Sequence, residues 1–100
     1  MELKPGTKLR SDVCETQVIV VRAPAGAVEL GCGGAPLIAA DADPAGTLDP
    51  DLSDGSLIGK RYADEDLGLE LLCTRGGAGT LTANGVTLAI KGAKPLPSSD

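Results

Sequence analysis

Short runs of β-branched and aliphatic residues, separated by Gly, Pro and Asp, make up most of the chain. The run at residues 17–21 lies within a β-like stretch from 13 to 22, which is too short and too β-branched for a helix. Similar short strands are predicted at residues 28–30, 56–62 and 69–73. Gly, Pro and Asp between the runs are typical of turns. The pattern therefore predicts an all-β chain.

The clearest turn is Asn84-Gly85, between residues 80–83 and 86–90. Asn-Gly is the preferred pair for a two-residue type I′ hairpin turn, in which both central residues need φ > 0. Strand alternation then places these apolar residues on one face: Leu81, Ala83, Val86, Leu88 and Ile90. We expect a C-terminal hairpin here.

A second hairpin is predicted at residues 13–32, because Ala-Pro-Ala-Gly at 23–26 is a turn signal. Residues 41–55, rich in Asp, Pro and Gly, are predicted to form an acidic loop, and 92–100 an extended tail. Since about 100–200 residues usually make one domain, we expect the chain 1–100 to be a single domain. Its N-terminal hairpin is expected to pack on a C-terminal β-hairpin region at 56–91.

The composition limits both the core and the chemistry. The chain has no His, Trp or Phe, and Tyr62 is its one aromatic residue, so the core must be aliphatic. Without His there is no Ser-His or Cys-His catalytic pair and no His metal ligand. No pair of carboxylates is singled out by its spacing for acid–base work. We therefore expect no enzymatic activity.

The chain is acidic, with nine basic and fourteen acidic residues and a net charge of −5. It shows no basic stripe and no stacking aromatics, so nucleic acid is an unfavourable partner. The longest clean apolar run, at residues 18–21, is far shorter than the ~20 residues that span a bilayer. The N-terminus lacks the apolar region of a signal peptide. We expect a cytoplasmic protein without membrane contact.

Three cysteines, Cys14, Cys32 and Cys73, carry the candidate chemistry. An odd count in a reducing compartment favours thiols or metal ligands over a disulfide framework. Three interpretations are open: buried free cysteines, a thiolate metal or redox site that uses all three, or a disulfide between Cys14 and Cys32. Arg75 is the nearest candidate for a positive charge that would lower a thiol pKa.

Cys14 stands directly before the β-branched run, and residues 30–37 read Leu-Gly-Cys-Gly-Gly-Ala-Pro-Leu. In these features residues 8–38 resemble desulforedoxin and the N-terminal domain of desulfoferrodoxin, with their C-x-x-C-G knuckle, V-x-V strand, Gly-rich turn and L-x-C-C-G-x-P-M segment. The resemblance implies a small rubredoxin-like β fold, often dimeric, that holds iron between four cysteines. Cys14 and Cys32 match two of these ligands, whereas Ser11 and Gly33 stand where the other two would be.

These observations support two hypotheses. The first is a non-enzymatic accessory or interaction domain whose desulforedoxin-like site has lost two ligands, with another protein or a second copy of itself as partner and no cofactor. The second is a thiolate protein that binds Fe or Zn, or a redox protein, using Cys14, Cys32 and Cys73. Two thiolates alone do not supply the about 10–16 kcal/mol of a full structural metal site.

Three further segments complete the candidates. Lys60-Arg61-Tyr62 is the one compact basic-aromatic cluster and is the predicted interaction surface. The Asp-rich loop does not fit an EF-hand, because counting from Asp49 the sixth position is Asp54 and the twelfth is Lys60. The Gly-rich segment 75–80 has no helix pattern after it, so we expect a turn rather than a phosphate-binding loop.

Overall fold

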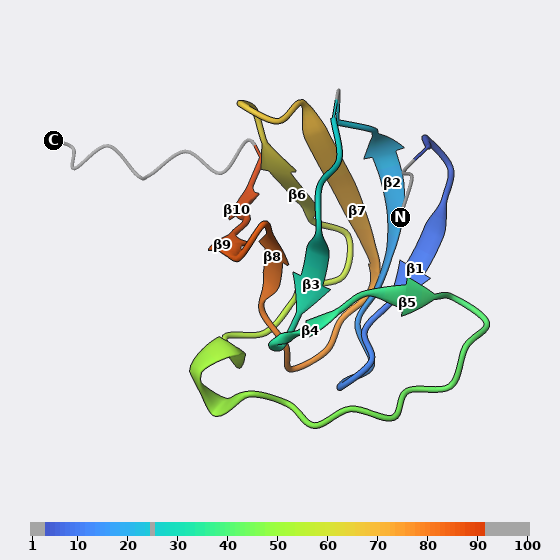
Figure 1. Cartoon of the computed structure of the whole chain (residues 1–100), viewed down its shortest axis with the longest axis vertical. Coiled ribbons are helices and arrows are strands. Elements are labelled where there is room, and N and C mark those ends of the chain that lie inside the picture. Colours follow the sequence, from blue (N-terminus) through green and yellow to red (C-terminus); the bar gives the residue numbers. More distant parts are fainter. Residues whose placement is uncertain (1–3, 25, 92–100) are drawn as a thin grey trace, which may run out of the picture.

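The computed structural model describes residues 4–24 and 26–91. They form two antiparallel β-sheets, of six and four strands, and one 3₁₀ turn at Pro50–Leu52 (Figure 1). The all-β prediction is confirmed. Within the described ranges, no helix has the length and apolar character needed to cross a membrane.

The larger sheet has the strand order β10-β6-β7-β2-β1-β5. Its strands are β1 (Lys8–Arg10), β2 (Gln17–Arg22), β5 (Ile38–Ala39), β6 (Arg61–Asp64), β7 (Leu69–Arg75) and β10 (Ala89–Ile90). The two longest strands, β2 and β7, pair near its centre, with Val18 opposite Cys73 and Val20 opposite Leu71. This pairing joins the N-terminal and C-terminal halves of the chain.

The smaller sheet has the strand order β4-β3-β8-β9. Its strands are β3 (Leu30–Cys32), β4 (Ala35–Pro36), β8 (Leu81–Ala83) and β9 (Val86–Thr87). Cys32 lies opposite Leu81 where β3 and β8 pair. The chain passes from one sheet to the other after β2, β4, β7 and β9, and each sheet contains strands from both halves of the chain (Figure 1).

One hydrophobic cluster contains buried residues of both sheets. Val18 and Leu71 of the larger sheet and Leu81 of the smaller are at most 1% exposed. Tyr62, 6% exposed, belongs to the same cluster, and its hydroxyl accepts a hydrogen bond from the N–H of Leu57 at 2.9 Å. The core is aliphatic, as the composition requires, and each fully buried side chain of this kind contributes roughly 1.5–3 kcal/mol.

The predicted hairpin at residues 13–32 is wrong. β2 and β3 lie in different sheets, because β2 pairs with β1 and β7 while β3 pairs with β4 and β8. A local turn signal at 23–26 does not reveal partners that are distant in the sequence. The expected packing of one hairpin on another is therefore replaced by two sheets that each mix the two halves of the chain.

The C-terminal hairpin is confirmed in its turn and corrected in its extent. Asn84 and Gly85 have φ values of 51° and 81°, as a type I′ turn requires. Val86 lies opposite Ala83, as the alternation predicts, but is 62% exposed because β9 is an edge strand. Ile90 leaves this face and pairs with Tyr62 in the larger sheet.

The other predicted segments differ mainly at their ends. The strand expected at 56–62 begins only at Arg61, after an isolated bridge between Ser56 and Gly77. The strand expected at 69–73 is present as β7 and continues to Arg75. Residues 41–55 form the predicted loop, interrupted by the 3₁₀ turn. The predicted tail at 92–100 lies outside the described residues.

Asn84 attaches the β8–β9 turn to the segment before β3. Its Oδ1 accepts a hydrogen bond from Glu29 N (2.9 Å), and its own N–H donates to Glu29 O (2.8 Å). We expect Asn84→Ala to lower the free energy of unfolding by about 1–3 kcal/mol, because Ala lacks the acceptor and is strained at positive φ. Asn84→Gly keeps the φ but not the acceptor and should lose less. Urea denaturation measures the free energy of unfolding of both variants. If the two variants lose equal stability, backbone strain at position 84 does not contribute.

Candidate functional site

Cys14 and Cys32 come together from different parts of the chain. Cys14 lies in the turn between β1 and β2, and Cys32 is the last residue of β3. Their Sγ atoms are 3.8 Å apart. Cys14 is partly exposed, whereas Cys32 is fully buried. The pair therefore has one thiol that solvent can reach and one that it cannot.

The turn that carries Cys14 is organised by two buried hydroxyl residues. Ser11 Oγ accepts hydrogen bonds from the N–H groups of Val13 and Cys14, both at 3.1 Å. Ser11 N donates to Thr16 O (2.8 Å), which closes the turn. Thr16 Oγ1 lies 3.3 Å from Cys14 Sγ. Ser11 and Thr16 are both fully buried, so this turn places hydroxyl groups around the thiol instead of water.

The Gly-rich segment after β7 forms the opposite wall of the site. Gly79 donates its N–H to Cys14 Sγ at 3.3 Å, and its carbonyl accepts a hydrogen bond from Ser56 Oγ at 2.6 Å. A Cβ at Gly79 would lie 2.8 Å from Cys32 Sγ, and a Cβ at Gly77 would lie 2.5 Å from Thr16 N. Side chains do not fit at such distances, so glycine is what allows the backbone to approach the sulfurs.

The acidic loop is attached to the same segments. Gly46 N donates to Asp12 O and Asp49 N donates to Gly33 O, both at 2.9 Å. Thr80 N donates to Leu52 O, also at 2.9 Å. The loop therefore runs past the Cys14 turn, the end of β3 and the Gly-rich segment, and holds the three to one another.

Hydrogen bonds and burial act in opposite directions on the two thiols. Burial raises the pKa of Cys14, but the hydroxyls of Ser11 and Thr16 and the N–H groups of Thr16 and Gly79 together lower it to about 7. Burial raises the pKa of Cys32 to about 11, and the negative charge of Cys14 acts in the same direction. Near neutral pH, Cys14 is therefore the cysteine of the pair that ionises, whereas Cys32 keeps its proton.

Cys73, the third predicted site residue, makes its hydrogen bond elsewhere. It is buried on β7, where its Sγ donates to Arg75 O at 3.2 Å, and burial raises its pKa. Among residues 4–24 and 26–91, no three His, Cys, Asp or Glu side chains are grouped as metal ligands. A metal site that uses all three cysteines stays a prediction.

The four-thiolate iron centre that the resemblance implies does not fit the residues present. Ser11 Oγ already accepts hydrogen bonds from two backbone N–H groups. Hydroxyls are also poor replacements for the soft thiolates of such sites. Gly33 has a φ of 65°, and a Cβ there would lie 2.6 Å from side-chain atoms of Leu48 and Val13. The site therefore offers two sulfurs and several hydrogen-bond donors rather than a tetrahedral set of sulfurs.

The predicted interaction cluster divides between surface and core. Lys60 and Arg61 are exposed. The ring of Tyr62 is a core residue, with its hydroxyl bonded to Leu57 N, so it does not form the aromatic part of a surface cluster. A contact through this segment would use the two basic side chains.

Sequence reasoning missed Thr16 and Gly79 as parts of the site. Thr16 lies two residues after Cys14, a spacing that brings its hydroxyl to the thiol. The Gly-rich segment was expected to be a turn. The sequence signal for its place in the site is that several small residues directly follow the strand that contains Cys73.

No family model, curated protein or solved structure matches this chain. The site is therefore interpreted from its own geometry.

We expect Gly79→Ala to lower the free energy of unfolding by about 1–3 kcal/mol, because the added methyl group overpacks the two sulfurs. The matched control is Gly26→Ala, since no atom lies within 4 Å of a Cβ at Gly26. Thermal or urea unfolding measures the difference. If both variants unfold alike, close packing at Gly79 is not a requirement of the fold.

Alkylation by iodoacetamide should be selective for Cys14 in the folded protein. Its rate should rise with pH with a midpoint near the Cys14 pKa of about 7, whereas buried Cys32 and Cys73 should react only on unfolding. If mass spectrometry gives an alkylation midpoint near pH 9 for Cys14, the thiolate is not stabilised by hydrogen bonds.

The same ionisation affects stability. Because the pKa of Cys14 in the folded protein lies below the ordinary value of 9.0, the thiolate stabilises the fold fully above pH 9, and this stabilisation is lost as the pH falls through 7.

Proposed function

We propose that this chain is a thiol redox protein in which Cys14 and Cys32 alternate between a dithiol and a disulfide. The observation that carries the proposal is the 3.8 Å separation of the two Sγ atoms, with Cys14 partly exposed and Cys32 buried. A disulfide needs the sulfurs at about 2.05 Å, so a modest movement of the Cys14 turn closes the bond. This is the redox form of the thiolate hypothesis, restricted to two of the three cysteines.

The first step is attack by Cys14 on a disulfide of a partner. The Cys14 thiolate forms a bond to one sulfur of that disulfide, and the other sulfur leaves as a thiolate that takes up a proton. The N–H of Gly79 holds the sulfur of Cys14 in place. Partial exposure of Cys14 allows the partner to approach.

Cys32 then resolves the mixed disulfide. The negative charge of Cys14 raises the pKa of Cys32 in the reduced protein, and that effect disappears once Cys14 is bonded to the partner. Cys32 can then lose its proton and attack Cys14 Sγ, which releases the second partner thiol. The dithiol loses two electrons and two protons, and the partner disulfide becomes two thiols.

Both parts of the first hypothesis, the desulforedoxin-like ancestry and the accessory or interaction role, stay compatible with this proposal. A rubredoxin-like ancestry is supported by the meeting of Ser11, Cys14 and Cys32, which are the positions where the resemblance expects ligands. An accessory or interaction role is compatible with thiol–disulfide exchange, because that reaction takes place within a contact between two proteins. Neither requires a resident metal.

Diamide, a thiol-specific oxidant, should convert the full chain to a form with a Cys14–Cys32 disulfide and a free Cys73. Peptide mapping under non-reducing conditions identifies the bond, and the intact mass should fall by about 2 Da. A reduction potential above roughly −300 mV would place the pair among exchangeable rather than structural disulfides.

The controls are Cys14→Ser and Cys32→Ser, neither of which should form an intramolecular bond. Linkage that involves Cys73, or stoichiometric Fe or Zn in anaerobically purified protein, would overturn the proposal. Cys73→Ala should leave the Cys14–Cys32 bond unchanged.

A further inference from the structure

Most of the strand-borne basic residues lie on one face of the larger sheet. Leu9, Val18, Val20, Leu71 and Tyr62 point into the core. Because successive strand residues alternate between faces, their neighbours point outward. The cations at these outward positions are Lys8, Arg10 and Arg61. Arg22 joins them because a register irregularity after Val20 places it opposite Glu70, and Lys91 follows β10 directly. We call this surface the cationic face.

Strand register brings these residues into rows across the sheet. Lys8 lies opposite Ile19, Ile19 opposite Leu72, and Leu72 opposite Arg61. Arg22 lies opposite Glu70 in a neighbouring row. Five segments that are separate in the sequence therefore supply one surface.

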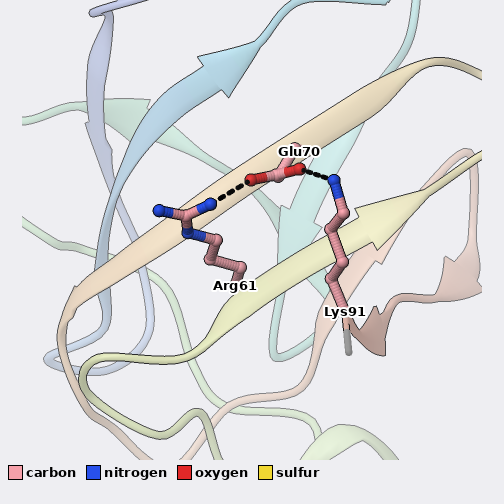
Figure 2. A network of polar contacts seen from close by, with 3 residues as sticks. All are labelled: Arg61, Glu70 and Lys91. Atoms are coloured by element: carbon pink, nitrogen blue, oxygen red, sulfur yellow. Dashed lines mark hydrogen bonds and ion pairs between the residues drawn. The ribbon is translucent and has the colours of Figure 1, made fainter. Parts of the chain in front are cut away.

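Glu70 is the one acidic residue at the outward positions of the described strands, and it is already paired. Its carboxylate binds Arg61 Nη1 at 3.3 Å and Lys91 Nζ at 2.5 Å, so it lies between the two cations (Figure 2). The hydrogen bond from Lys91 lowers the pKa of Glu70, and the charges of Arg61 and Arg22 act in the same direction. The carboxylate is only 5% exposed, whereas Arg61 is 58% exposed.

The cationic face thus carries five cations and one carboxylate, an excess of four positive charges, on a chain whose net charge is −5. The acidic residues of the 41–55 loop lie outside these strands. Such a separation of charge favours partners whose surface has the opposite charge and increases the rate at which they associate with this face. The complementary surface is anionic.

Apolar side chains between the cations favour a protein over a phosphate polymer. Ile19 and Leu72 lie partly exposed in the row between Lys8 and Arg61. A hollow of about 210 Å³ opens beside Ile19, lined in part by Lys8, Ile19 and Thr74. No described outward position holds an aromatic ring on which a base would stack. An apolar centre with charges around it is typical of protein–protein interfaces.

We propose that the cationic face of the six-stranded sheet binds a carboxylate-rich surface of a partner protein. The contact would place Asp or Glu side chains of the partner against Lys8, Arg22 and Arg61, with apolar groups over Ile19 and Leu72. This surface is independent of the thiol site, because it uses none of the residues that surround Cys14 and Cys32.

The probe is a poly-L-glutamate peptide, added to the ¹⁵N-labelled full chain at low salt. Nonspecific attraction works against this probe, because protein and peptide are both acidic overall. Amide shifts should be confined to β1, β2, β6, β7 and β10 with Lys91, and salt should weaken binding by screening. Shifts elsewhere, or no shifts at low salt, would overturn the proposal.

Single charge reversals test the residues. Lys8→Glu and Arg22→Glu should each weaken binding by about tenfold. Lys60→Glu is the matched control: it makes the same change of charge beside the face and should alter affinity by less than about twofold. Equal effects of all three would show attraction to overall charge only. Tighter binding of double-stranded DNA or of phosphatidylserine vesicles than of the peptide would also reject a protein partner.

Discussion

The antiparallel pairing of β2 with β7 is the constraint on which the rest of the structure depends. It sets the turn that precedes β2 beside the segment that follows β7, so Cys14 meets the N–H of Gly79. The pairing of β3 with β8 brings Cys32 to the same place from the other sheet. The thiol site is therefore a product of two long-range strand pairs that end at the same end of the molecule. Neither pair alone would assemble it.

Within that site, the balance between burial and hydrogen bonding decides the chemistry of each sulfur. Removal from water disfavours a thiolate at both positions. At Cys14 the donors on Ser11, Thr16 and Gly79 outweigh this penalty, whereas Cys32 has too little donation to compensate for it. Two cysteines in contact thus have pKa values shifted in opposite directions, and hydrogen bonds rather than a histidine lower the pKa of Cys14. An acidic chain without imidazole can still hold a thiolate in this way.

Local chemistry was predictable from the sequence and non-local pairing was not. The Asn84-Gly85 turn follows from two adjacent residues that accept positive φ, and it is present. The 13–32 hairpin failed because the partners of β2 are β1, which the pattern missed, and β7. The resemblance placed Ser11 and Cys14 near Cys32, but not Thr16 or Gly79, whose roles depend on tertiary contact. The cationic face could not be predicted from the sequence, because its residues come from strands that are far apart along the chain.

The acidic loop touches the thiol site mainly through its own backbone. Gly46 N, Asp49 N and Leu52 O make its contacts to Asp12, Gly33 and Thr80, and its aspartate side chains take no part in those three bonds. Backbone groups are shared by all residues, so substitution along most of the loop would leave these attachments in place. The loop could therefore change its charge over evolutionary time, and with it the molecules that approach Cys14, while the thiol pair itself stays the same.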